Sequence, residues 1–93
     1  MADKYTPLEK YLRDLPTSQE ELTLTFERIE QILNDSLPLQ AREPGPWWGN
    51  QKQGTHVEVN AWMDAGWKVN AVNFSEKWVR FIRQVIIVSP SRY

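Results

Sequence analysis

The sequence has no cysteine, a single histidine and no apolar run long enough to cross a membrane. The lack of cysteine excludes disulfides, thiolate nucleophiles and cysteine-bound zinc. The histidine, His56, has only Asn60 and Asp64 near it on one face of an expected helix, which is short of a usual metal site. There is also no G-x-S-x-G motif and no phosphate-binding glycine loop. We therefore expect a protein that is not an enzyme and holds no metal or cofactor.

The chain has little net charge, −1 over 93 residues, so charge alone does not suit it to coat a polyanion. The charge is unevenly divided, however. Residues 1–46 hold five Lys/Arg against nine Asp/Glu, a net of −4, and residues 47–93 hold six against three, a net of +3. All five tryptophans lie between Trp47 and Trp78. A basic, aromatic second half is typical of a surface that binds polyanions and stacked bases.

Capping residues and apolar spacing predict the secondary structure. Thr6 with Glu9, and Thr55 with Glu58, have the spacing of a capping box, and Thr25 is placed to cap another helix. Alternation of apolar and polar residues predicts the strands. In chain order we expect a helix over 7–14, a strand over 22–26, a helix over 26–33, a helical turn from Pro38, a loop over 43–54, a helix over 56–65 that ends at Gly66, and two strands over 67–71 and 79–83, the second of which the tail 85–88 can extend.

This order predicts a single α+β domain over 1–93, with an ordered core over about 6–84 and a tail over 85–93. Three helices, a short strand and a C-terminal β-hairpin resemble the winged-helix fold, with a long tryptophan-rich loop inserted. The motifs LPxxAR, WWxN and AWxxAGW, and the alternating VxFxR of the last strand, resemble a small, poorly characterised bacterial and phage domain family. Members of that family sometimes accompany nucleases or other DNA-associated domains, so the resemblance implies a nucleic-acid context and no particular binding residue.

The five tryptophans have different expected environments. Trp62 lies on the apolar arc of the third helix and Trp67 begins a strand, so both are expected in the core. For Trp47 and Trp48 two alternatives stay open: one indole is free to stack on a base, or both fold back over the core. Trp78 is out of phase with its strand, which leaves it either paired across the hairpin or exposed. The expected core is Leu8, Leu12, Phe26, Ile29, Leu33, Val57, Ala61, Trp62, Trp67, Val69, Val79 and Phe81.

The leading functional hypothesis is a non-catalytic module that binds nucleic acid, with DNA as the first candidate. The basic hairpin and the helix 56–65 would contact phosphates, while the tryptophan loop stacks and hydrogen-bonds. Arg42 is a further candidate for the basic stripe. An ordinary solvated surface is the alternative for each of these groups. The candidate binding residues are Trp48, Asn50, Lys52, His56, Asn60, Lys68, Lys77, Arg80 and Arg83.

The alternative hypothesis is a small protein-interaction module, such as a phage or bacterial regulator that inhibits another protein. Net charge is slightly negative, and the apolar tail Val85-Ile86-Ile87-Val88 is able to add a strand to a partner or to a second copy as a homodimer. No segment predicts a membrane anchor, and the first residues lack the apolar stretch of a signal peptide. We therefore expect a cytoplasmic protein.

Overall fold

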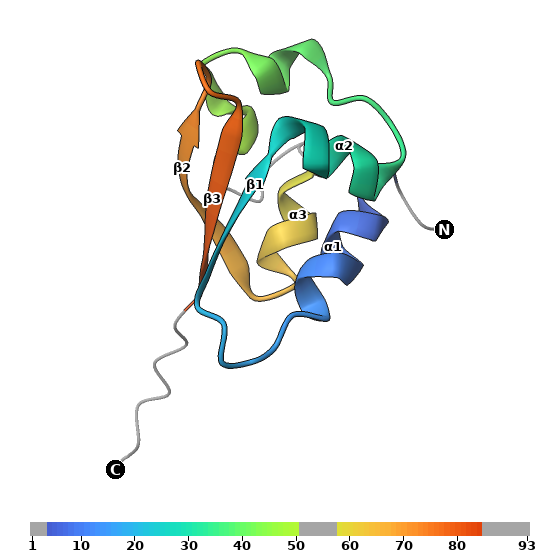
Figure 1. Cartoon of the computed structure of the whole chain (residues 1–93), viewed down its shortest axis with the longest axis vertical. Helices are drawn as coiled ribbons and strands as arrows, with labels where there is room; N and C mark the ends of the chain where they lie inside the picture. The colour runs from blue at the N-terminus through green and yellow to red at the C-terminus, as the bar shows by residue number, and fades with distance from the viewer. Residues whose placement is uncertain (1–3, 51–57, 85–93) are drawn as a thin grey trace.

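The computed structural model describes residues 4–50 and 58–84. Within these ranges the chain forms a small α+β fold with a three-stranded sheet and a layer of helices beside it (Figure 1). The tail 85–88, to which the homodimer prediction belongs, lies outside the described residues. The elements in chain order are α1 (Thr6–Arg13), β1 (Glu21–Thr25), α2 (Phe26–Leu33), the 3-10 turns η1 (Leu39–Arg42) and η2 (Pro46–Trp48), α3 (Glu58–Met63), β2 (Trp67–Asn73) and β3 (Trp78–Arg83).

The sheet is antiparallel, with β3 in the middle between β1 and β2. Leu22 pairs with Phe81, which confirms the prediction that the first strand joins the terminal hairpin. Val69 also pairs with Phe81 from the other side, and the register then shifts by one residue between Val69 and Ala71. Because side chains alternate along a strand, this pairing sets Leu22, Leu24, Val69, Val79 and Phe81 on one face.

That apolar face packs against α1, α2 and α3 (Figure 1). Leu12, Ile29, Trp62 and Phe81 are among the residues with no accessible surface, so the core lies between the sheet and the helices. The expected core is buried as predicted, with two qualifications. Val69 is only partly buried, and Val57 lies outside the described residues.

The helix ends agree with the sequence at Thr25 but not at Thr6. The Thr25 hydroxyl accepts a hydrogen bond from the Arg28 N–H at 3.0 Å, which confirms the predicted cap. The capping box of α1 is wrong, because Tyr5 occupies the cap position and its carbonyl accepts from the N–H of Leu8. Tyr5 is 7% exposed, and burial of its ring in the core draws the helix start one residue back.

The segment 43–54, expected to be a loop, contains η2 in its described part. Helix α3 ends at Met63, two residues before the predicted end, and Gly66 lies in the turn that follows with φ +90°, a conformation that is costly for residues with a Cβ. No helix among the described residues combines the length and apolarity needed to cross a membrane.

Candidate nucleic-acid interface

The tryptophan loop folds back over the core, so the second of the two alternatives for Trp47 and Trp48 is correct. Trp48 is 4% exposed and lies between Phe26 and Trp62, with ring centroids 6.0 and 5.6 Å apart and interplanar angles of 11° and 25°. Its indole N–H donates to the Ala41 carbonyl at 2.8 Å. Both faces of the ring are already stacked, so the prediction that Trp48 stacks on a base is wrong.

The side chain of Asn50 also makes its hydrogen bonds within the protein. Its side-chain N–H donates to the Val69 carbonyl at 2.9 Å, and its oxygen accepts from the Val69 N–H at 2.9 Å. The same oxygen accepts from the Trp62 indole N–H at 3.1 Å. The amide therefore pairs with the free edge of β2 as a neighbouring strand would, and it pins the tryptophan loop to the sheet. All three bonds go to the protein, so Asn50 has a structural role, and its contact with a ligand stays a prediction.

Arg83 lies on the helix side of the sheet, away from the other basic hairpin residues. Its guanidinium donates to the carbonyls of Pro16 at 2.8 Å and Gln19 at 3.0 Å, and it lies 4.3 Å from the centre of the Trp67 ring. These contacts fasten the segment between α1 and β1 to the core. The guanidinium thus has a structural role within the chain, and a phosphate contact at Arg83 stays a prediction.

Arg42 likewise binds within the protein, to the carboxylate of Glu30. The Leu37 N–H donates to the same carboxylate at 2.8 Å. This backbone hydrogen bond is the main cause that holds the pKa of Glu30 below its ordinary value, with the Arg42 guanidinium adding to it against the opposing effect of desolvation. Arg42 therefore joins η1 to α2 rather than extending a basic stripe.

Helix α3 offers little surface for recognition in its described part. Glu58, Val59, Ala61 and Trp62 are all buried, and Asn60 is half-buried. The described part of the expected polar stripe is thus the half-buried Asn60 and the exposed Asp64, which follows the helix. The candidates His56 and Lys52 lie outside the described residues.

The remaining basic candidates gather on the face of the sheet that the helices do not cover. On β3, Trp78 and Arg80 are half-buried, and the Arg80 guanidinium lies 5.3 Å from the centre of the Trp78 ring. On β2, the exposed Lys68 pairs with Ile82, the next outward residue after Arg80. We call this surface the open face. By strand alternation and register its residues are Glu21, Thr23, Thr25, Lys68, Ala71, Asn73, Trp78, Arg80 and Ile82.

Lys77 stands beside the open face at the hairpin turn, in a different electrostatic setting. Its backbone has φ +63°, a left-handed conformation that few residues other than glycine and asparagine adopt. It also lines a shallow depression together with Glu27, Glu30 and Glu76. Arg42 lines the same depression and binds Glu30, so two further carboxylates, Glu27 and Glu76, share it with Lys77 and make Lys77 a weaker candidate for a phosphate contact than Lys68.

Sequence reasoning missed the polar neighbours of Trp78 and Arg80. Thr25 and Asn73 pair with Trp78 from the two flanking strands, and Thr23 pairs with Arg80. Alternation in the first strand already put Thr23 and Thr25 on one face. The missing information was the register, which decides the residues that face each other across strands.

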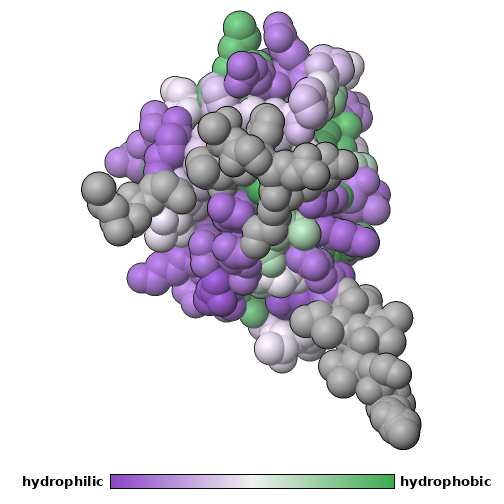
Figure 2. Space-filling model, turned by 180° about the vertical axis from the view of Figure 1, so that it is seen from behind, coloured by the Kyte–Doolittle hydropathy of each residue, from purple (hydrophilic) through white to green (hydrophobic). Residues whose placement is uncertain are grey.

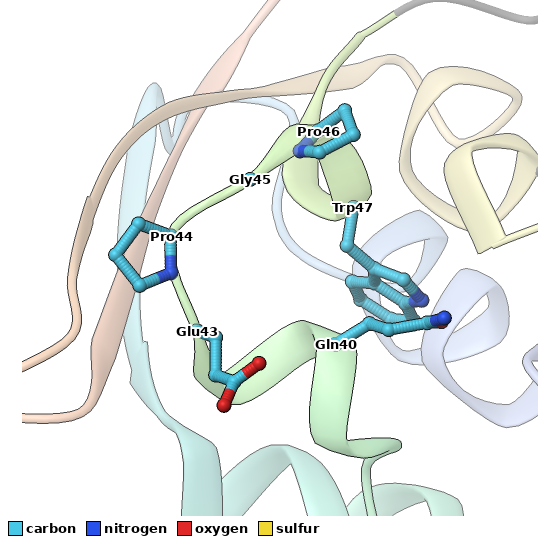
Figure 3. Close-up of a pocket in the computed structure, with 6 residues that line it drawn as sticks. All are labelled: Gln40, Glu43, Pro44, Gly45, Pro46 and Trp47. Atoms are coloured by element: carbon cyan, nitrogen blue, oxygen red, sulfur yellow. The ribbon is translucent and has the colours of Figure 1, made fainter.

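A separate pocket of about 230 Å³ lies in the tryptophan loop. Trp47 and Gln40 form one wall, and the backbone from Glu43 to Pro46 curves around the other (Figure 3). Nearby in sequence, Leu39 is 70% exposed and is the one large apolar residue with such exposure among those the structure describes.

Viewed from behind, the described surface is mainly hydrophilic (Figure 2). In residues 4–50 and 58–84 no three His, Asp or Glu side chains are grouped as a metal site requires.

The comparisons place the chain in one family. A family model with the description "Domain of unknown function (DUF7662)" matches residues 5–84, so the chain belongs to this family. No curated protein and no solved structure matches the chain. The family description states neither a fold nor an activity, so a functional conclusion has to start from the surface of the molecule.

Proposed function

We propose that this member of the DUF7662 family is a non-catalytic module that binds nucleic acid on the open face of its sheet. One observation carries the proposal: Trp78, Arg80 and Lys68 share a sheet face that no described helix covers. An aromatic ring with cations around it matches the two chemical features of a nucleic acid, its base faces and its phosphates.

Several of the other basic and aromatic candidates make their contacts within the protein, and this leaves the open face as the favoured surface for a ligand. Trp48, Asn50 and Arg83 all contact the protein interior, and Arg42 binds Glu30. Trp78, in contrast, is only half-buried, and its contact with Arg80 forms a charged, planar surface on the central strand, at the hairpin end of the sheet. Two carboxylates lie at this surface: Glu21 stands at its edge on β1, and Glu76 in the hairpin turn accepts a hydrogen bond from the Trp78 indole N–H at 3.4 Å.

The order of the elements supports a winged-helix type of fold as part of this proposal. The short strand β1 lies before α2 and pairs with the terminal hairpin, which is the arrangement on which the resemblance rests. Winged-helix domains commonly use a helix in the major groove. Because the described part of α3 is mainly buried, we assign the contact here to the sheet and its hairpin.

The proposal is tested by fluorescence anisotropy with labelled DNA and RNA oligonucleotides across a series of salt concentrations. We expect log affinity to fall linearly with log salt, and Lys68→Ala and Arg80→Ala each to flatten that slope by roughly 0.7–0.9 for each lost phosphate contact. Lys10→Ala is the matched control, since Lys10 is an exposed cation on α1, in the helix layer. If the folded parent binds no nucleic acid at the lowest salt, the proposal is wrong.

A protein-interaction module remains the second candidate, because of Leu39 and the adjacent pocket. A large apolar side chain that is 70% exposed beside a proline-lined cavity is typical of a contact for another protein. If that candidate is correct, Leu39→Asp abolishes co-purification of a partner from the native cell and leaves the melting temperature unchanged. If the variant retains its partner, or no partner co-purifies with the parent, this candidate is wrong.

A further inference from the structure

We infer that the ligand of the open face is a single-stranded nucleic acid whose bases stack on the Trp78–Arg80 pair. This inference rests on the proposed function and narrows it to one substrate class. Trp78 and Arg80 are neighbours on the same face of β3, and the guanidinium lies 5.3 Å from the centre of the indole ring. A ring and a guanidinium in contact are a preformed stacking surface, which accepts a base of any type.

Strand geometry favours an unstacked ligand. Residues two apart along a strand are separated by ~6.6–6.8 Å, and Trp78, Arg80 and Ile82 project from β3 at this interval. In a duplex each strand advances by about 3.4 Å per nucleotide. Bases that sit over successive outward residues of β3 must therefore be spread about twice as far apart as in a duplex, and a single strand can adopt such a spacing.

The neighbours of Trp78 provide hydrogen-bonding groups for an exposed base. Thr25 and Asn73 pair with it from β1 and β2, so a hydroxyl and an amide flank the ring on the same face. The Thr25 oxygen already accepts from the Arg28 N–H at 3.0 Å and the Asn73 side-chain oxygen from the Glu76 N–H at 2.8 Å, so these two groups offer a base their hydrogens as donors. Base edges are free for such contacts in a single strand, whereas in a duplex they are reached only through the grooves.

The tryptophans of this protein allow a direct optical test. Trp47, Trp48, Trp62 and Trp67 are at most 7% exposed, and Trp78 alone among the five is half-buried. A base that stacks on the protein at an indole must therefore act on Trp78. We expect acrylamide to quench one accessible tryptophan in the parent, and a bound oligonucleotide to protect it.

The deciding experiment compares labelled oligo-dT, oligo-U and a DNA hairpin duplex of equal charge, using the parent, Trp78→Ala, Trp78→Phe and Arg80→Lys. We expect both single strands to bind more tightly than the duplex. Trp78→Ala should weaken single-strand binding by about 5- to 150-fold, the range found for loss of one stacked base, with an unchanged salt slope. Trp78→Phe should retain most of the affinity, and Arg80→Lys should lose part of it because a lysine keeps the charge without the planar surface.

The outcomes separate this inference from the proposed function. Equal or tighter binding of the duplex, or a Trp78→Ala variant that binds single strands as the parent does, overturns the single-strand inference and leaves nucleic-acid binding intact. No binding to any of the three probes overturns both. Circular dichroism melts establish that each variant is folded, and Arg80→Lys serves as the informative variant if Trp78→Ala unfolds, since parent-like binding of single strands by Arg80→Lys also overturns the inference. Preference between oligo-dT and oligo-U assigns the ligand to DNA or RNA.

Discussion

Replacing Asn50 by alanine should destabilise the fold strongly, although Asn50 lies in a loop and is not in the apolar core. Three hydrogen bonds are lost at once, two to the edge of β2 at Val69 and one to the indole of Trp62. Water can replace the amide at a sheet edge, so each of those two bonds costs about 0.5–1.5 kcal/mol. Trp62 has no accessible surface, and its unsatisfied N–H costs roughly 1–3 kcal/mol. The three hydrogen bonds together predict a loss of roughly 2–6 kcal/mol in the free energy of unfolding, a large part of the stability of a small domain.

Urea unfolding followed by tryptophan fluorescence measures this loss. The double-mutant cycle with Trp62→Phe isolates the indole bond, because Asn50→Ala should cost less where no indole N–H is left to satisfy. Asn50→Asp keeps the acceptor but loses the donor to the Val69 carbonyl. That variant should recover stability relative to the parent as the pH falls and the aspartate gains a proton to donate. A folded Asn50→Ala protein with the parent's urea midpoint, or with lost nucleic-acid binding and unchanged stability, would refute the reasoning.

Three further predictions concern charged residues with defined partners. Arg83→Ala should lower the free energy of unfolding by roughly 1–3 kcal/mol. Arg83→Lys should lower it by less but should not match the parent, because lysine lacks the planar guanidinium that reaches two carbonyls. Thermal melts of the two variants and the parent measure the difference. The pKa of Glu30 is lower in the folded state than in the unfolded chain, where it is near 4.3. The ionised carboxylate therefore contributes fully to the free energy of unfolding above about pH 4.3, and this contribution is lost as the pH falls through the pKa of Glu30 in the folded state. In urea titrations, Glu30→Gln should therefore flatten the acid limb of stability against pH, and an unchanged limb would contradict the assignment. Lys77→Asn should raise the melting temperature, by a gain of roughly 0.5–1 kcal/mol, because asparagine adopts the left-handed conformation more readily; a lower melting temperature would show that the Lys77 side chain itself stabilises the turn.

Much of the fold could be predicted from short-range patterns. The alternation of Leu22 and Leu24 indicated a strand, the hydroxyl of Thr25 indicated the start of α2, and Gly66 indicated the end of α3. Each of these signals is carried by residues within one or two turns of chain, which is the range over which propensity and capping act. The failure at Thr6 has the same origin, since the burial of Tyr5 depends on packing against Trp47, far along the sequence.

The candidate site was harder to predict, because residue type did not distinguish a ligand-binding group from an internal one. Trp48, Asn50 and Arg83 have the chemistry of nucleic-acid contacts, and each uses it on the protein itself. Arg80 and Trp78 have the same chemistry and face outward. Arg80 and Arg83 are three residues apart on β3, so they lie on opposite faces of the sheet. Only the pairing of β3 with both neighbouring strands shows which of the two faces is covered.

The sequence by itself determined the order of helices and strands, the side of each that is apolar, and the separation of an acidic half from a basic, aromatic half. The tertiary structure decided how the polar groups are used. Arg83 meets Gln19 across 64 residues of chain, and the Trp67 indole donates to Leu12 across 55. The periodicity of apolar residues predicts whether a residue is buried, but the packing of the whole chain decides which segment buries it. Every buried hydrogen-bond donor must also find an acceptor, and that acceptor often lies far away in the sequence.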